Sequence, residues 1–359
     1  MRLDAFTERI MRKNKNNQSK LPLTISAQYG LVDQITFFNK VIASTDMSSY
    51  YLLKKGEFAY NKSYSSDYPW GAIKRLDNYD QGALSSLYIC FAPQNNVASD
   101  FILQYFESPK WHKVVSEIAV EGARNHGLLN VSVQDFFHTY HYVPKDKKEQ
   151  IKIAKLLMLL DERISTQTKI IDKLQSLIKG IAQHCIRELI NVWEYVRLGN
   201  ICKITTGKLD ANAQVENGQY PFFTCAERPF NIDSYAFDTE ALLISGNGAN
   251  LGYVNYYKGK FNAYQRTYVL DHFSVNIQYV KWALKVLLPQ RIAIEKSSSN
   301  TPYIVLSTLA DLKIPIPNNS KQNHIADLMM SFERKLSTQL ALSDLYNKQK
   351  QYLLRQMFI

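Results

Sequence analysis

Two short motifs in the sequence contain glycine and lysine at spacings close to those of loops that bind the phosphates of nucleotides. The segment Gly246–Gly252 resembles a dinucleotide-binding loop, but its third glycine comes one position late and a strand pattern follows it. No helix N-terminus would therefore face a phosphate there. Thr206, Gly207 and Lys208 lack both the first glycine of a P-loop and the serine or threonine that should follow the lysine. We interpret the first motif as a tight loop and exclude the second as a nucleotide cradle.

Histidines and cysteines do not form the clusters that metal binding needs. His138 with His141, and His184 beside Cys185, are isolated pairs without a matching second pair. Cys90, Cys202 and Cys225 also lack metal-ligand spacing, and Cys185 falls in an apolar helical stripe. We therefore expect structural histidines and reduced thiols, with neither zinc nor a disulfide.

Catalytic signatures are equally absent from the sequence. No two prolines are adjacent, so the Asn-Pro-Pro-aromatic tetrapeptide of adenine methyltransferases cannot occur. The sequence links no nucleophile to a base and an orienting residue. These observations predict a chain that is not itself an enzyme.

The charge balance is compatible with a polyanionic partner. The 359 residues contain 43 Lys and Arg against 32 Asp and Glu, together with 23 tyrosines. Neither feature is diagnostic, because tyrosine also fills ordinary cores. The length allows two globular domains with extended helices. The basic N-terminus and the lack of any run of about 18 apolar residues predict a cytoplasmic protein without a signal peptide or a spanning helix.

An internal repeat indicates how the chain is organised. The segment Val143–Ile186 has a second copy at the C-terminus, in which Pro317 and Gln322 match Pro144 and Gln150. Ser165-Thr166-Gln167 in the first copy is identical to Ser337-Thr338-Gln339 in the second. The chain therefore consists of two related halves, each a variable region closed by the same long helix.

Apolar residues in both copies recur with the alternating steps of four and three that mark a coiled-coil seam. The first seam is Ile153, Leu157, Leu160, Ile164, Gln167, Ile171, Leu174, Ile178, Ile181 and Cys185. The second is Ile325, Met329, Phe332, Leu336, Gln339, Ser343, Tyr346, Lys350, Leu353 and Met357, supplemented by Leu328, Leu340 and Leu345. We expect the helices to pair antiparallel about an approximate two-fold axis and, at roughly 54 Å each, to hold two domains apart. Plain core packing is the alternative for either stripe, and Gln167 and Gln339 would either fix the register or lie on a solvated rim.

The first variable region predicts strands followed by helices. Strands are expected at Tyr50–Leu53, Glu57–Tyr60 and Leu84–Phe91. Ser99 and Asp100 should cap a helix that breaks at Pro109, and a second helix should run from Lys110 to about Val120. A short strand at Leu128–Val133 should close the region.

The second variable region repeats this order. Strands are expected at Tyr220–Thr224, Ala241–Ser245, Tyr253–Tyr257 and Thr267–Leu270, and Tyr303–Leu306 should correspond to Val131–Val133 of the strand that closes the first region. Asn276 should head a helix that ends at Pro289. The predicted fold class is α+β: a first domain over residues 1–142, a central helix over 143–190, a second domain over 191–313 and a C-terminal helix over 314–359.

Two halves of this kind resemble the specificity (S) subunits of type I restriction-modification enzymes, the HsdS family. The resemblance rests on Val143, Pro144, Glu149, Gln150, Ile153, Ala154, Leu157 and Asp161 with their copies Ile316, Pro317, Gln322, Ile325, Ala326, Met329 and Glu333. It also rests on Trp193, Val196, Arg197, Leu198, Gly199, Ile201, Thr206, Gly207 and Lys208, followed by Gly218, Tyr220, Pro221 and Phe222, which look like the opening of a target-recognition domain. Met1–Asp4 lack this Trp-initiated opening, so we expect the first strand of the first domain to be shortened or missing.

The resemblance implies a non-catalytic subunit that reads a bipartite target in double-stranded DNA. Each target-recognition domain would read one half in the major groove, and the coil would set the number of unread base pairs. The implied partners are two modification (methyltransferase) subunits and restriction (translocase and nuclease) subunits, which would bind S-adenosylmethionine, ATP and Mg in place of this chain. The alternative is a coiled-coil spacer or regulator that binds proteins and has no DNA specificity of its own.

Candidate DNA contacts are the polar, planar or basic residues on loops between strands. In the first domain they are Lys62, Tyr64, Tyr68, Trp70, Lys74 and Arg75. In the second they are Lys208, Arg228, Asn247, Asn250, Gln265 and Arg266. Gly246 and Gly248 would allow the backbone to approach DNA closely. For each side chain, a solvated loop position without a DNA contact is the alternative.

Overall fold

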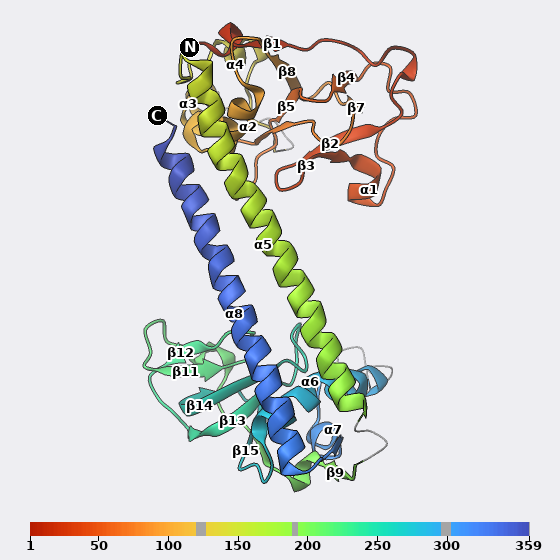
Figure 1. The fold of residues 1–359 in the computed structure, drawn as a ribbon, viewed down its shortest axis with the longest axis vertical. Helices are drawn as coiled ribbons and strands as arrows, with labels where there is room; N and C mark the ends of the chain where they lie inside the picture. Colours follow the sequence, from red (N-terminus) through yellow and green to blue (C-terminus); the bar gives the residue numbers. More distant parts are fainter. Residues whose placement is uncertain (120–126, 189–192, 296–302, 359) are drawn as a thin grey trace. The chain divides into compact units, whose positions relative to one another are not determined.

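The chain forms two compact units in the computed structural model, which describes residues 1–119, 127–188, 193–295 and 303–358. The first unit contains Met1–Thr168 with Leu342–Ile359, and the second contains Lys169–Ala341. Two long helices, α5 (Lys147–Glu188) and α8 (Asn319–Gln356), contribute to both units. Each unit therefore combines a mixed α+β domain with a stretch of each long helix (Figure 1).

The first unit contains two four-stranded sheets, ordered β1-β8-β5-β6 and β3-β2-β7-β4. The strands are β1 (Thr7–Arg9), β2 (Pro22–Ser26), β3 (Gly30–Asp33), β4 (Tyr51–Lys54), β5 (Phe58–Asn61), β6 (Ala72–Arg75), β7 (Gln81–Leu84) and β8 (Ile89–Pro93). The helices are η1 (Leu3–Ala5), η2 (Lys15–Asn17), α1 (Gln34–Phe38), α2 (Ser99–Glu107), α3 (Lys110–Ile118) and α4 (Val133–His138). Aromatic residues fill the core between them: the Tyr60 ring lies 5.0 Å from that of Phe136 and 5.8 Å from that of Trp111.

The second unit contains one six-stranded sheet, ordered β10-β15-β13-β14-β11-β12, and a two-stranded sheet of β16 and β9. The strands are β9 (Tyr195–Arg197), β10 (Lys203–Thr206), β11 (Tyr220–Phe223), β12 (Phe230–Ile232), β13 (Phe237–Ser245), β14 (Val254–Ala263), β15 (Thr267–Asp271) and β16 (Lys313–Pro315). The helices are η3 (Leu198–Asn200), η4 (Ala211–Ala213), α6 (Ile277–Glu295) and α7 (Leu306–Ala310). α6 packs on the large sheet, where Tyr279 and Ala283 share one core with Leu242 and Leu270.

The two sheets of the first unit correspond to the single large sheet of the second unit, divided in two. β13 and β14 pair continuously from Phe237↔Phe261 to Ile244↔Val254. In the first unit the same hairpin is split into the pairs β4–β7 and β5–β6 by a turn at Gly56, whose N–H bonds to the Leu76 carbonyl at 2.8 Å. β2 pairs in parallel with β7 as β11 does with β14, and β1 pairs with β8 as β10 does with β15. The frames of the two domains therefore agree, as the repeat predicted.

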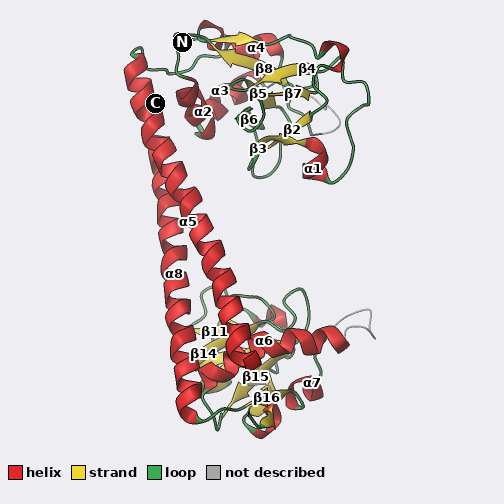
Figure 2. Ribbon diagram, turned by 45° about the vertical axis from the view of Figure 1, so that its right-hand side comes forward, coloured by secondary structure: helices red, strands yellow, loops and turns green. Residues whose placement is uncertain are grey.

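α5 and α8 run side by side in each unit (Figure 2), and seam residues of the two helices share a core there. In the first unit Leu354 and Phe358 join the core of Ala154 and Leu157, and Lys350 forms an ion pair with Asp161. Along these contacts the residue numbers rise on α5 while they fall on α8, so the two helices pair antiparallel, as predicted. In the second unit, Ile178 and Ala182 of α5 share one core with Met329 and Leu336 of α8.

Two details of the predicted seams are settled by burial. Gln167 is 5% exposed, so its position on a solvated rim is ruled out. Leu340 and Leu345, expected to supplement the second seam, are 47% and 60% exposed. They lie off the half-buried stripe through Leu336, Gln339 and Tyr346, because the helical period turns them toward solvent.

Six predicted strands are confirmed as β4, β5, β11, β13, β14 and β15. Four of them shift by at most one residue at either end, whereas β13 begins at Phe237 rather than Ala241 and β14 ends at Ala263 rather than Tyr257. The predicted strand Leu84–Phe91 is wrong in its middle. β7 ends at Leu84 and β8 begins at Ile89, and the Tyr88 N–H bonds to the Ser85 carbonyl at 3.2 Å in the turn between them. A run of strand-forming residues thus conceals a turn.

The strands predicted at Leu128–Val133 and Tyr303–Leu306 are wrong. Val131 and Ile304 are buried, 3% and 4% exposed, but they lie in irregular segments that lead into α4 and α7. Leu128 makes only an isolated bridge, to Ser63. Tertiary packing buries these apolar residues although they form no ladder of backbone hydrogen bonds with a neighbouring strand. An apolar run alone therefore could not identify a strand.

The predicted ends of two helices also need correction. α6 continues through Pro289 to Glu295, because Leu288 and Ile292 on either side of the proline are buried in the core and offset the lost backbone hydrogen bond. α2 has Ala98 at its N-cap rather than Ser99 or Asp100. Asn276 does cap α6, as predicted, since its Oδ1 accepts from the Gln278 N–H at 2.9 Å.

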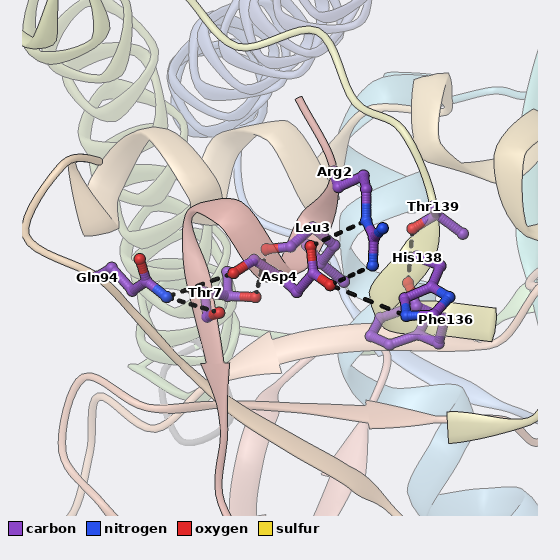
Figure 3. Close-up of polar contacts among 8 residues, drawn as sticks. All are labelled: Arg2, Leu3, Asp4, Thr7, Gln94, Phe136, His138 and Thr139. Atoms are coloured by element: carbon purple, nitrogen blue, oxygen red, sulfur yellow. Dashed lines mark hydrogen bonds and ion pairs between the residues drawn. The ribbon is translucent and has the colours of Figure 1, made fainter. Parts of the chain in front are cut away.

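A short 3₁₀ turn opens both domains. The Leu3 N–H bonds to the Thr139 carbonyl at 2.9 Å, as the Leu198 N–H bonds to the Leu312 carbonyl at 2.9 Å. In the second unit this turn follows β9, which pairs with β16. At the corresponding place in the first unit, Arg2 makes only a single bridge to Tyr140. Around this turn Arg2 pairs with Asp4 at 2.6 Å, and the Thr7 hydroxyl donates to the Leu3 carbonyl at 2.8 Å (Figure 3).

His141 makes the first unit sensitive to acid. Its ring lies within 2.8 Å of the Tyr105 hydroxyl and 2.7 Å of the Thr139 hydroxyl, and burial lowers its pKa from 6.5 to about 4. The folded state therefore holds this imidazole neutral, and the stability is fully present above pH 6.5 and falls as the pH drops toward 4. We expect a loss of up to about 3 kcal/mol over this interval. In urea unfolding as a function of pH, His141→Gln should flatten the slope.

Candidate nucleic-acid interface

Four loops of the second unit meet at one end of its large sheet. The Gln265 N–H bonds to the Leu209 carbonyl at 2.9 Å, and the Gly246 N–H bonds to the Arg266 carbonyl at 2.8 Å. The Asn250 amide donates to the Cys225 carbonyl at 3.0 Å. These bonds join loops 207–210, 224–229, 246–253 and 264–266, which together we call the loop cluster.

Curling of the sheet brings these loops together. Phe261 on β14 pairs with Phe237 at the start of β13, whereas Arg266, soon after the end of β14, bonds to Gly246 just beyond the other end of β13. A flat sheet could not satisfy both contacts with so short a connection, so the hairpin must coil strongly. Strands far apart in the sequence thus deliver their loops to one place.

The loop cluster holds all six candidate residues of the second domain. Lys208, Arg228, Gln265 and Arg266 are exposed, and Asn247 and Asn250 are half-buried. The Gln265 amide donates to Asp210 at 3.1 Å, and Asn250 holds the loop of Cys225, so these two amides already have partners within the protein. Among the described residues, none of the cations Lys208, Arg228 and Arg266 forms an ion pair. The cluster therefore presents three cations that are able to contact a polyanion.

Two glycines in the cluster are required by the packing of the loops themselves, whereas a third has open space around it. A Cβ on Gly246 would lie 2.4 Å from the Arg266 carbonyl oxygen, so the expectation that this glycine lets DNA approach has a structural alternative within the protein. Gly207 is tighter still, with the Ala263 oxygen at 1.9 Å from a Cβ. Gly248 has a φ of +77° and open space around it.

Gly207→Ala should therefore disrupt the loop cluster while Gly248→Ala should not. The clash at Gly207 is with backbone and forces the loops apart, whereas alanine at Gly248 costs only about 1–2 kcal/mol of left-handed strain. We expect Gly207→Ala to lower the unfolding midpoint of the second unit more than Gly248→Ala and to increase protease cleavage in loops 207–210 and 264–266. Equal behaviour of the two variants would contradict this account.

Lys74 and Arg75 of the first unit serve the fold. The Lys74 ammonium lies 2.6 Å from Glu107, and Arg75 contacts Asp77 at 2.7 Å and Asp100 at 2.8 Å. Their side chains are only 13% and 12% exposed. Both cations tie β6 to its surroundings, chiefly α2, so we remove them from the proposed DNA contacts.

The remaining candidates of the first unit lie on the loop between β5 and β6, which corresponds to loop 246–253. Tyr64 is 54% exposed, whereas Tyr68 and Trp70 are half-buried. The Lys62 ammonium donates to the Val131 carbonyl at 3.3 Å, and the Trp70 carbonyl accepts from the Tyr60 hydroxyl at 2.9 Å. Tyr64 is thus the most available side chain of this loop.

Two positions beside these loops were missed by the sequence reasoning. Tyr303 is 57% exposed and adjoins Ile304, whose N–H bonds to the Gly246 carbonyl at 2.9 Å. Leu87, 67% exposed, lies in the β7–β8 turn that corresponds to loop 264–266. Both fall in segments predicted as strands, and only the register of the two frames could have identified them as loop positions.

Other kinds of site find little support. Among the described residues, no three His, Cys, Asp or Glu side chains gather in a way that could hold a metal ion. None of the four cysteines forms a disulfide with another described residue. No helix in the described part of the chain has the length and apolar character needed to cross a membrane.

Comparison with known proteins gives one consistent match. Residues 191–342 match the family model of the type I restriction modification DNA specificity domain. The EcoDI specificity subunit of Escherichia coli is 43% identical over 149 residues, which is 42% of this chain and 31% of that protein. A Mycoplasma pneumoniae protein named as a type I specificity subunit is 26% identical over 201 residues, 52% of this chain and 73% of that protein. This chain thus matches less than a third of the length of the first of these relatives.

Solved structures match along the whole chain. The S subunit of a type I restriction-modification system from M. genitalium has a TM-score of 0.64 at 16% identity, covering 100% of this chain and 95% of that one. A chain from a study of assembly and conformational transition in a type I system has a TM-score of 0.58 at 17% identity, covering 99% and 96%. At such low identity these matches concern the fold, and they confirm the predicted α+β class with long helices.

Proposed function

We propose that this chain, which over residues 191–342 belongs to the family of type I restriction modification DNA specificity domains, is a sequence-specific DNA-recognition subunit of a type I restriction-modification complex. The resemblance predicted from the repeat is confirmed by the family model and by the relatives. In this proposal the chain performs no catalysis. Two modification subunits would methylate adenine and restriction subunits would translocate and cleave DNA, with S-adenosylmethionine, ATP and Mg bound by those partners. Its location in the cytoplasm stays a prediction.

The loop cluster is the observation that supports a DNA-reading role most directly. It gathers three exposed cations and the half-buried amide of Asn247 from four loops of the large sheet. Cations without internal partners can neutralise phosphates or form bidentate bonds to guanine, and amides can pair with adenine. The first domain has the same frame with different loops, so we propose that it reads the other half of a bipartite target. Candidate contacts there are Tyr64, Tyr68, Trp70 and Lys62.

Methylation mapping tests this proposal. The chain is produced with its modification subunit, and methylated adenines are mapped across a genome. The expected result is one motif with two specified halves and a fixed unread gap. Methylation at a continuous motif, or at no defined motif, would refute the proposed reading of a split target.

The second candidate, a protein-binding spacer or regulator without DNA specificity, is favoured only by the long helices themselves. Salt dependence of binding to duplex DNA separates the two candidates. A DNA reader loses affinity linearly on a log–log plot, with a slope of about −0.9 for each phosphate neutralised. A spacer without DNA specificity binds the target and an unrelated duplex with equal affinity at every salt concentration.

A further inference from the structure

A repeated glutamine joins each recognition domain to its long helix. The Gln150 amide donates to the Pro144 carbonyl at 2.8 Å, and its Oε1 accepts from the Ala98 N–H at 2.8 Å, at the start of α2. Gln322 makes the same two bonds, to the Pro317 carbonyl at 2.7 Å and from the Asn276 N–H at 3.0 Å, at the start of α6. Both glutamines are buried, 1% and 2% exposed. The start of the domain helix is thereby attached to the start of the long helix in both units.

A second attachment lies about three helical turns farther along each long helix. In the first unit Asp161 accepts from the Gln104 amide at 2.9 Å, and Gln104 lies on α2. In the second unit the equivalent Glu333 accepts from Lys281 of α6 at 2.6 Å and from Lys285 at 3.2 Å. Gln104 and Lys281 are 2% and 6% exposed, whereas the side chains of Asp161 and Glu333 are 38% and 32% exposed, so both second points lie at the edge of the packed interface with a buried donor. The chemistry of the second point differs between the units, but its place is the same.

Two points of attachment restrain the pivoting of the domain helix on the long helix, which a single point would allow. A single hydrogen-bonded end lets a helix pivot about it, whereas a second bond one or two turns farther along the domain helix sets the crossing angle. The reading loops of each domain extend from the sheet on which that same helix packs. Any change in the crossing angle therefore moves those loops relative to the long helix.

We propose that Gln104 and Lys281 are positioning residues that set the orientation of each recognition domain on the long helices and thereby the spacing at which the two half-targets are accepted. This inference rests on the proposed function and deepens it, because it assigns control of the gap to the attachment of the domains as well as to helix length. The half-target sequences themselves are read by the loops and do not depend on these residues.

Gln104 offers a variant that should fold. Its Oε1 is buried without a hydrogen-bond partner, so Gln104→Met removes the bond to Asp161 together with an unsatisfied atom at little change in volume. Asp161→Asn is the matched variant: it loses the ion pair with Lys350 but keeps an oxygen that can accept from Gln104. Gln290→Met, at an exposed position of α6, is the control for the change of residue type.

The experiment measures methylation by the assembled complex on targets whose halves are separated by the native gap or by one base pair more or fewer. In Gln104→Met, methylation at the altered gaps, relative to the native gap, should rise about tenfold over wild type, as expected when a bond of about 1.4 kcal/mol no longer restrains the angle. Lys281→Met should act likewise. Asp161→Asn and Gln290→Met should retain the native preference. Unchanged gap preference in Gln104→Met and Lys281→Met, or altered half-target sequences, would overturn the inference.

A measurement without DNA separates failure of this inference from failure of the proposed function. Spin labels at Leu87 and Glu162, both exposed and both in the first unit, report the distance between the domain and α5 in a variant whose native cysteines are replaced. Gln104→Met should broaden the distance distribution and Asp161→Asn should not. An equally narrow distribution in Gln104→Met would overturn the inference even if the wild-type complex reads a split target.

Discussion

Replacing Lys208, Arg228 and Arg266 together by alanine is expected to lower the affinity for target DNA about 100- to 1000-fold. The three cations lie on separate loops of one cluster and form no ion pair among the described residues, so each is available to a phosphate or a guanine. A contribution of about 1 to 1.4 kcal/mol from each gives this range. Equilibrium binding measured over a series of salt concentrations checks it, because the salt slope should fall by about 0.9 for each phosphate that is no longer neutralised.

A charge-matched control separates local contacts from net charge. Lys258, Lys313 and Lys348 are exposed cations outside the loop cluster, and the first and last already pair with Glu240 and Asp344. Replacing these three by alanine removes the same charge from the formal net charge of +11. We expect this control to reduce affinity far less. An equal loss in both triple variants would mean that the cluster acts only through the overall field.

The single variant Arg266→Ala tells base contact from phosphate contact. Loss of a bidentate bond to guanine should relax the preference at one position of one half-target by about 1 to 3 kcal/mol. Loss of a phosphate bond should lower affinity equally for all sequences. Mapping of the methylated motif distinguishes these outcomes, and the half-target read by the first domain should stay unchanged in either case.

Gln322→Ala is expected to destabilise the second unit by about 2 to 6 kcal/mol. The substitution leaves the Asn276 N–H and the Pro317 carbonyl without the amide that now satisfies both, at a site only 2% exposed. A buried polar group without a partner costs about 1 to 3 kcal/mol, and two are created here. Urea unfolding followed by tryptophan fluorescence, to which Trp282 in the buried core of the same unit contributes, measures the effect.

The repeat supplies the comparison for this second experiment. Gln150→Ala breaks the same two bonds in the first unit and should lower the free energy of unfolding of that unit by a similar amount. The part of the transition that reports the second unit should stay unchanged. Lys321→Ala, next to Gln322 but exposed, should change stability by less than about 0.5 kcal/mol. If Gln322→Ala were as mild as Lys321→Ala, the glutamine could not be the attachment that its geometry indicates.

The sequence by itself determined the two long helices, through the period of their apolar residues, and their antiparallel pairing, through the folded region between them. Helical spacing is a local property, and a seam such as Leu157, Leu160 and Ile171 is visible from sequence alone because it repeats over several turns. The loop positions of the six candidates of the second domain were also visible locally, since glycine and polar residues mark the loops between strands. The repeat itself showed that Gln150 and Gln322 are equivalent.

Tertiary structure alone decided what these residues contact. Lys74 and Arg75 have the same local pattern as Lys208 and Arg266, but only the placement of α2 supplies Glu107 and Asp100 as partners and removes the first pair from the candidate surface. The bonds of Gln150 span from Ala98 to Pro144, and the curl that joins Arg266 to Gly246 depends on strand pairing over the whole hairpin. Burial of Leu288 and Ile292 carries α6 past Pro289 against its local preference. Each of these outcomes depends on residues distant in sequence, because hydrogen bonds and burial are satisfied by whatever the fold brings near.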